Sequence, residues 1–131
     1  MYLDIKDRKI DPNKLISYIR SKNKNNKIIL GSFNKKLLKK INKEEGILIN
    51  YHCFSPFLSI RRAKELDADW INPLPYLITN KKIEKIKNNG FKFVPAGNEN
   101  YKKQMKYLKL GAHALSIHDI KKINNFLQNN L

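Results

Sequence analysis

The sequence predicts an α/β fold built from successive strand–helix units, and two observations predict it. Six apolar segments that are candidate strands begin at a regular spacing, near residues 2, 27, 46, 68, 91 and 112. A segment with helical periodicity follows each of them, so that one unit takes about 20–25 residues, which is typical of parallel strands joined by helical crossovers. The short, uniform period favours a (β/α)8 barrel of the TIM type over a doubly wound open sheet. No Gly-x-Gly-x-x-Gly motif follows any of these segments, which argues against a dinucleotide-binding sheet.

The expected strands differ in their patterns. Residues 2–6 alternate apolar and polar side chains, which is the period-2 pattern of a strand. The run 27–33 is continuously apolar, as in a strand buried on both faces. In a barrel, we expect Ile28 and Leu30 of this run to point inward. The other four expected strands cover residues 46–52, 68–72, 91–94 and 112–118.

Five expected helices begin with a residue that is a good amino-terminal cap or first-turn residue. These residues are Asp11-Pro12, Asn34, Ser55-Pro56, Thr79 and Asp119, and a further helix is expected from about Asn100. Gly90 and Gly111 follow two of the helices and are expected to end them. The expected inward side chains of the last two helices are Met105, Leu108 and Leu110, and then Ile120, Ile123, Phe126 and Leu127.

Length and composition indicate one folded domain over residues 1–131. The chain is 41% hydrophobic, and its 27 Lys and Arg residues against 11 Asp and Glu residues give a net charge of +16. Such a charge can indicate nucleic-acid binding. The lysines, however, are spread over every expected helix and alternate with asparagines, whereas a nucleic-acid groove gathers cations with stacking aromatics. A nucleic-acid partner is therefore disfavoured.

The single cysteine, Cys53, permits no intramolecular disulfide, which is consistent with a reducing compartment such as the cytoplasm. No uninterrupted apolar run approaches the roughly 20 residues of a membrane span. The expected first strand follows Met1 at once, which suggests that elements preceding it are missing or are supplied by another chain.

Polar residues stand at the carboxyl end of nearly every expected strand, where barrels of this class place their functional groups. Alternation puts Asp4 and Lys6 on one face of the first strand. A carboxylate can hold a metal ion and an ammonium can meet a phosphate oxygen, although the pair can equally be a simple ion pair. The further candidates for the rim of a polar pocket are Ser32, Asn50, His52, Asn72 and His118.

Three segments together resemble the glycerophosphodiester phosphodiesterases. The segments are Leu3-Asp4-Ile5-Lys6, Gly31-Ser32-Phe33-Asn34 and Ala68-Asp69-Trp70-Ile71-Asn72-Pro73. The resemblance extends over essentially the whole chain and implies phosphoric diester hydrolysis in glycerophospholipid metabolism. It implies Asp4 as a ligand of a divalent metal (Mg²⁺ or Ca²⁺), Lys6 as the phosphate-binding residue, and a glycerophosphodiester-type small molecule as the partner.

The departures from this family affect the expected activity. The family's opening His-Arg-Gly strand, its Glu-x-Asp metal pair and its second His have no counterpart in this chain, which resembles the last six of eight barrel units. The resemblance therefore implies that this chain carries no catalytic residue and is a partial barrel domain that is inactive on its own. It also implies that the chain either associates with itself or lacks an amino-terminal segment. The alternative is a non-catalytic α/β protein that binds phosphate, another anion or nucleic acid through its basic surface.

Overall fold

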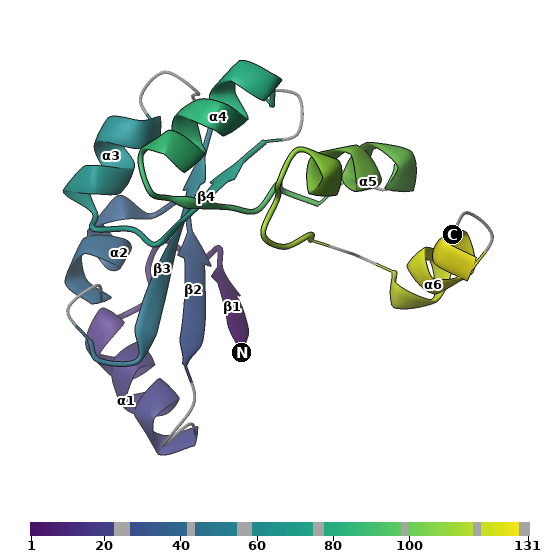
Figure 1. Cartoon of the computed structure of the whole chain (residues 1–131). Helices are drawn as coiled ribbons and strands as arrows, with labels where there is room; N and C mark the ends of the chain where they lie inside the picture. The colour runs from purple at the N-terminus through teal and green to yellow at the C-terminus, as the bar shows by residue number, and fades with distance from the viewer. Residues whose placement is uncertain are drawn as a thin grey trace.

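The computed structural model describes residues 1–22, 27–41, 44–54, 59–74, 78–97, 100–116 and 119–128. Within them, five parallel strands form one sheet in the order β1-β2-β3-β4-β5 (Figure 1). The strands are β1 (Tyr2–Ile5), β2 (Ile28–Ser32), β3 (Ile47–Cys53), β4 (Trp70–Pro73) and β5 (Lys92–Phe93). The helices are α1 (Pro12–Lys22), α2 (Lys35–Ile41), α3 (Ser59–Glu65), α4 (Asn80–Asn88), α5 (Tyr101–Lys109) and α6 (Ile120–Gln128). The predicted alternation of parallel strands and helices is confirmed.

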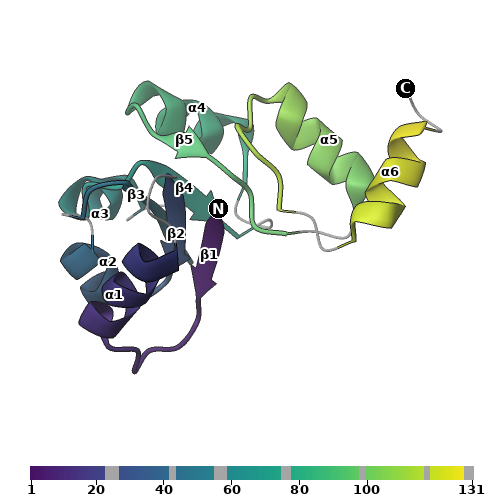
Figure 2. The same cartoon turned by 90° about the horizontal axis from the view of Figure 1, so that it is seen from below.

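The first helices cover one face of the sheet. Each strand pairs with the next strand of the chain, and right-handed crossovers between such neighbours place all the connecting helices on the same side. Figure 2 shows α1, α2 and α3 along that side, away from α5 and α6. These helices leave the other face of the sheet uncovered. In a barrel, the corresponding face is the inner one.

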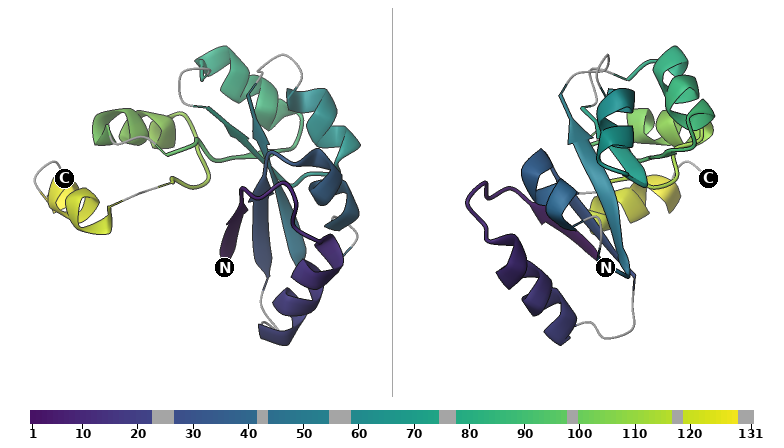
Figure 3. Two further views of the ribbon diagram at one scale, coloured as in Figure 1. Left: turned by 180° about the vertical axis from the view of Figure 1, so that it is seen from behind. Right: turned by 90° about the vertical axis from the view of Figure 1, so that its left-hand side faces the viewer.

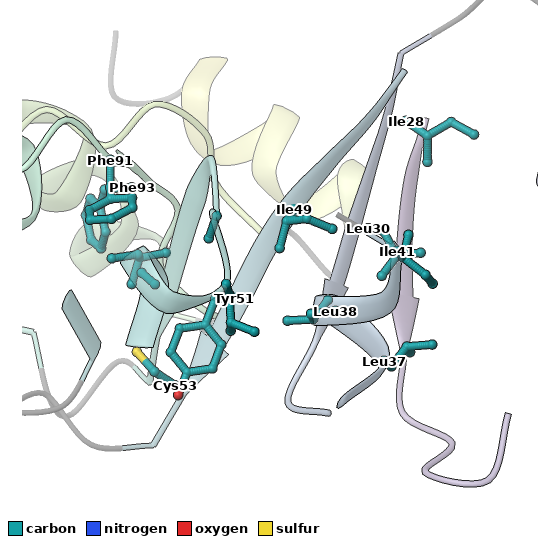
Figure 4. Close-up of a cluster of buried hydrophobic side chains, with 14 of the residues drawn as sticks. Ile28, Leu30, Leu37, Leu38, Ile41, Ile49, Tyr51, Cys53, Phe91 and Phe93 are labelled. Atoms are coloured by element: carbon teal, nitrogen blue, oxygen red, sulfur yellow. The ribbon is translucent and has the colours of Figure 1, made fainter. Parts of the chain in front are cut away.

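The hydrophobic core lies between the sheet and its helices (Figure 4). Leu37, Leu38 and Ile41 of α2 are almost fully buried there. They pack in one cluster with strand residues that share a face: Ile28, Leu30, Ile49, Tyr51, Ile71 and Phe93. This burial of apolar surface is the main force that fixes the sheet against the helices.

The expectation that Ile28 and Leu30 point into a barrel is wrong. Both belong to the core between the sheet and the helices, and they are 1% and 0% exposed. Ile29 and Gly31 take the opposite face, because successive side chains alternate along a strand. A continuously apolar run contains no polar residue that would tell the two faces apart.

The sixth expected strand is also absent from the described residues. The described part of its segment, residues 112–116, has no strand or helix, and one backbone hydrogen bond, from His113 N to Phe93 O (2.9 Å), joins it to β5. Because β5 has only two residues, it offers little ladder for another strand to pair with. Residues 117 and 118 lie outside the described part of the chain.

The caps are as predicted where the structure describes them. The side chains of Asp11, Asn34, Thr79 and Asp119 each accept a hydrogen bond from a first-turn backbone N–H. Asn100 caps α5 in the same way, which was not predicted from the sequence. Residues 55–58, with the expected Ser55-Pro56 helix start, lie outside the described residues. Positive φ values at Gly90 and Gly111, 81° and 88°, follow α4 and α5.

The inward face of α5 differs from the expected one. Gln104 and Tyr107 are buried, whereas Leu108 is 38% exposed. Leu110, which follows the helix, packs against the core as expected. Figure 3 shows α5 and α6 together at the end of the chain, away from α1. The side chains expected to face inward from α6 (Ile120, Ile123, Phe126 and Leu127) lie outside what the structure describes. None of the described helices combines the length and apolar character that a bilayer crossing needs.

Candidate functional site

The uncovered face of the sheet carries a polar cluster that begins with Tyr2. Its hydroxyl lies 2.8 Å from Nε2 of His52, two strands away. The side chain reaches that far because Gly31 of the intervening strand has no Cβ. A Cβ built there would collide with the Tyr2 hydroxyl and would lie 2.5 Å from His52 Nε2. Gly31 is therefore the residue that lets Tyr2 and His52 meet.

Asn50 adds a second hydrogen bond to the Tyr2 hydroxyl. Its side chain is fully buried and donates from Nδ2 to that oxygen at 3.0 Å, and the buried Asn72 side chain lies beside the same hydroxyl. Because the neighbouring Asp4 carboxylate can only accept, we assign the proton of a neutral His52 to Nδ1, and Tyr2 then donates its own proton to Nε2. The protonated ring nitrogen, Nδ1, faces Asp4.

Asp4 connects this cluster to the solvent. Its Oδ1 lies 3.8 Å from His52 Nδ1, and its Oδ2 lies 3.7 Å from Lys6 Nζ. Lys6 is 83% exposed and Asp4 is 38% exposed, whereas His52 is almost fully buried. The exposed Asp4–Lys6 pair stabilises the fold little. It does place an accessible ammonium at the carboxyl end of β1, next to a buried imidazole.

The surroundings of the cluster favour neutral rings. Burial lowers the pKa of His52 below its ordinary 6.5, and Lys6 lowers it further, although the nearby Asp4 carboxylate acts in the opposite direction. Burial raises the pKa of Tyr2 above 10.0, and the charge of Asp4 adds to that rise while the hydrogen bonds from Asn50 and Asn72 oppose it. At neutral pH the imidazole and the phenol are both uncharged.

The structure thus brings together five of the residues that the sequence singled out: Asp4, Lys6, Asn50, His52 and Asn72. Ser32 lies apart from this cluster, since it shares the covered face with Leu30, but it lines a cleft that adjoins the site. Its Oγ donates to Ile5 O (2.7 Å) and accepts from Asn34 N (3.0 Å). This is a structural role in the turn after β2. His118 lies outside the described residues.

Asp4 was expected to bind a divalent metal. Among the described residues, no three His, Cys, Asp or Glu side chains gather into a metal site. The side chains beside Asp4 are the Lys6 ammonium and the His52 imidazole, whereas Mg²⁺ and Ca²⁺ take several oxygen ligands. The described residues alone therefore do not fit such an ion.

Two features of the site were not found from the sequence. Tyr2 was treated only as part of a strand, although the same alternation places it on the face of Asp4 and Lys6. The other feature is a cleft of about 860 Å³ beside the site. Its lining includes Lys6, Arg8, Lys35, Lys36 and Lys40, which come from two separate segments and could not be grouped from the sequence.

Comparison with solved structures identifies the same fold. A phosphodiesterase from Oleispira antarctica, in complex with the product sn-glycerol-3-phosphate, superposes with a TM-score of 0.79 at 16% identity, over 89% of this chain and 49% of that one. A glycerophosphodiester phosphodiesterase from Parabacteroides distasonis gives a TM-score of 0.75 at 14% identity, over 98% of this chain and 57% of that one. The chain thus spans about half the length of the solved structures it matches.

No protein-family model matches the sequence, and no curated protein matches it. The likeness at 14–16% identity therefore concerns the fold. The parallel strand order, the helices on one face and these superpositions agree with one another. The resemblance suggested by the sequence is confirmed at that level: this chain has the α/β barrel-type fold of the glycerophosphodiester phosphodiesterases, over about half of their length.

Proposed function

We propose that this chain is a glycerophosphodiester phosphodiesterase-like protein whose Asp4–Lys6 pair receives the phosphate of a glycerophosphodiester. The observation that carries the proposal is the position of Lys6. Its ammonium is accessible at the carboxyl end of a strand, where this class of fold places its ligands, and it lies 3.7 Å from the Asp4 carboxylate. The solved neighbour from Oleispira antarctica holds sn-glycerol-3-phosphate, a phosphate monoester of the expected product type.

In this proposal each residue of the cluster has a distinct task. Lys6 contacts a phosphate oxygen, and Asp4 holds the ammonium in position. Tyr2 fixes the tautomer of His52, so that the imidazole keeps its proton on Nδ1 beside Asp4. In this proposal, a divalent ion such as Mg²⁺ or Ca²⁺ would have Asp4 as one ligand. Its other ligands would have to come from groups other than the described residues.

We also propose that the chain does not turn over its ligand on its own. His52 is the one imidazole that the described part of the chain places in the cluster, and its Nε2 is occupied by Tyr2. General acid–base groups contribute on the order of 10²–10⁴-fold each, so a site with no free pair of them is disabled. A reducing compartment such as the cytoplasm suits the single thiol, Cys53, which is buried.

A calorimetric titration with sn-glycerol 3-phosphate tests the phosphate-binding role. The Lys6→Gln variant removes the ammonium, while the Lys9→Gln variant removes an exposed charge from the same loop and serves as the matched control. A charged hydrogen bond is worth about 1.5–3 kcal/mol, so Lys6→Gln should raise Kd about tenfold or more. Equal affinities of the two variants would refute the assignment of Lys6.

The same titration separates the second candidate function, non-catalytic anion binding. The observation that favours it is the basic cleft beside the site, which offers more cations than one phosphate needs. Inorganic sulfate binding as tightly as sn-glycerol 3-phosphate would support this alternative. A clear preference for the glycerol ester would support the phosphodiesterase-like function.

A further inference from the structure

The basic cleft is continuous with the candidate site, because Lys6 belongs to both and Phe33 of the cleft lining contacts His52 of the site. Lys6 lines the cleft and pairs with Asp4. Phe33 also lines the cleft, and its ring meets the ring of His52 edge to face with 5.0 Å between the centroids. A phosphate held by Lys6 would therefore lie at the edge of the cleft.

The charge of the cleft is of one sign. Five cations line it, and no Asp or Glu of the described residues does; the five are Lys6, Arg8, Lys35, Lys36 and Lys40. They come from the segment after β1 and from α2, where Lys35 and Lys36 begin the helix and Lys40 lies in its last turn. Cations gathered around a concave surface add their potentials and attract anions into it. Among the described residues no carboxylate pairs with Arg8, Lys35, Lys36 or Lys40, so one phosphodiester charge at Lys6 leaves these four cations able to attract a further anion.

The cleft also has an apolar part. Phe33 and Phe54 stack with 4.1 Å between their centroids and 15° between their planes, and Phe54 is 61% exposed. The remaining apolar lining is Ile5, Ile10, Pro12 and Leu37. Aromatic rings alone would suit a quaternary ammonium group through cation–π contacts. The five surrounding cations would repel a quaternary ammonium group, so the cleft does not suit such a ligand.

We propose that this cleft binds the alcohol half of the phosphodiester and selects a head group that carries its own negative charge, such as a phosphorylated cyclic polyol. The carbon ring of such a group packs on Phe54, and its additional phosphate meets the Lys36 and Lys40 ammonium groups. The inference rests on the proposed function, because it assumes that Lys6 holds the diester. It adds the class of alcohol that the site accepts.

Affinity measurements on matched diesters test the selection. The probes are glycerophosphoinositol, glycerophosphoinositol 4-phosphate and glycerophosphocholine, titrated calorimetrically at about 0.1 M salt. The first two differ by one phosphate. We expect the phosphorylated diester to bind at least about tenfold more tightly than glycerophosphocholine, since several unit charges act over short distances.

Helix α2 provides matched variants for the cleft. Lys36→Gln and Lys40→Gln each remove one charge from the lining, whereas Lys39→Gln removes one exposed charge of the same helix outside the lining. We expect the first two to weaken binding of glycerophosphoinositol 4-phosphate several-fold and the third to leave it nearly unchanged. The affinity for glycerophosphocholine should change little in all three.

The outcomes separate this inference from the proposed function. If all three diesters bind with equal affinity and Lys6→Gln weakens each of them, the proposed function stands and the selection of an anionic head group is wrong. If Lys39→Gln weakens binding as much as Lys36→Gln, the effect belongs to the whole basic surface, and the cleft has no special role. If no diester binds, both proposals fail.

Discussion

The Tyr2 hydroxyl lies 2.8 Å from Nε2 of His52, and Gly31 makes this contact possible by leaving the space between them empty. The contact joins the edge strand β1 to the central strand β3. It also determines which nitrogen of His52 faces Asp4. The arrangement of the site therefore depends on a glycine that takes no part in binding.

Gly31→Ala should disturb this contact. The new Cβ would meet Tyr2 and His52, and overpacking of this kind costs about 1–3 kcal/mol of unfolding free energy. In a Tyr2→Phe background the same change should cost less, because one of the two colliding atoms is gone. Urea denaturation of the four proteins measures the difference. A cost near zero in the wild-type background would show that Tyr2 and His52 both move away freely.

The stability of the chain should depend on the protonation of His52. Burial lowers the pKa of His52 in the folded state below the 6.5 of the unfolded state, so the unfolded chain binds more protons between these two values. Stability should therefore rise with pH across this window, level off above about 6.5, and fall as the pH drops through it.

The contribution of His52 to the pH dependence of stability can be isolated by urea denaturation of wild type and of His52→Gln at several pH values below and above about 6.5. The difference in unfolding free energy between the two proteins should change with pH in the direction given above. Identical pH profiles would show that His52 is not the group responsible.

The isolated chain should release no glycerol 3-phosphate above background. The expected reason is the lack of a free acid–base pair and of a complete set of metal ligands among the described residues. Glycerophosphocholine and glycerophosphoethanolamine, each assayed with Mg²⁺, Ca²⁺ and Mn²⁺, provide the measurement. Metal-dependent release that disappears in Asp4→Ala would contradict the expectation and would make Asp4 a metal ligand.

The purified chain should associate with itself. Within the described residues, β1 pairs only with β2, so the outer edge of β1 offers unpaired backbone groups. At the other edge, His113 occupies the backbone N–H and C=O of Phe93 in β5. The net charge of +16 opposes association, and salt screens that repulsion.

Size-exclusion chromatography with light scattering, at about 0.05 M and 0.5 M salt, tests this. The screening lengths at these ionic strengths differ about threefold. The average mass should rise with protein concentration and with salt. A single monomer peak at both salts and at all concentrations would show that the edge of β1 is protected.

The period of the fold could be read from the sequence, but the orientation of individual strands could not. The alternation of polar and apolar residues in 2–6 predicted correctly that Asp4 and Lys6 lie on the same face of the first strand. The continuous apolar run around Leu30 carries no such signal, and its inward direction was predicted wrongly. The prediction of a further strand after β5 was wrong, because the two residues of β5 offer too little backbone for another strand to pair with.

The candidate site was predictable in part for a similar physical reason. Polar residues at strand ends gather in parallel folds, so Asn50, His52 and Asn72 could be placed near Asp4 in advance. The cleft could not be predicted, because lysines at neighbouring positions of α2 differ in what they line. Lys36 and Lys40 face it and Lys39 does not, which depends on the exact rotation of the helix.

The central claim is that Lys6 and its neighbours receive the phosphate of a glycerophosphodiester. An experimental structure of this chain with sn-glycerol 3-phosphate tests it most directly. We expect phosphate oxygens within hydrogen-bonding distance of Lys6 Nζ, on the side of the sheet that carries Tyr2 and His52. A phosphate bound elsewhere on the basic surface, with Lys6 still paired only to Asp4, would contradict it.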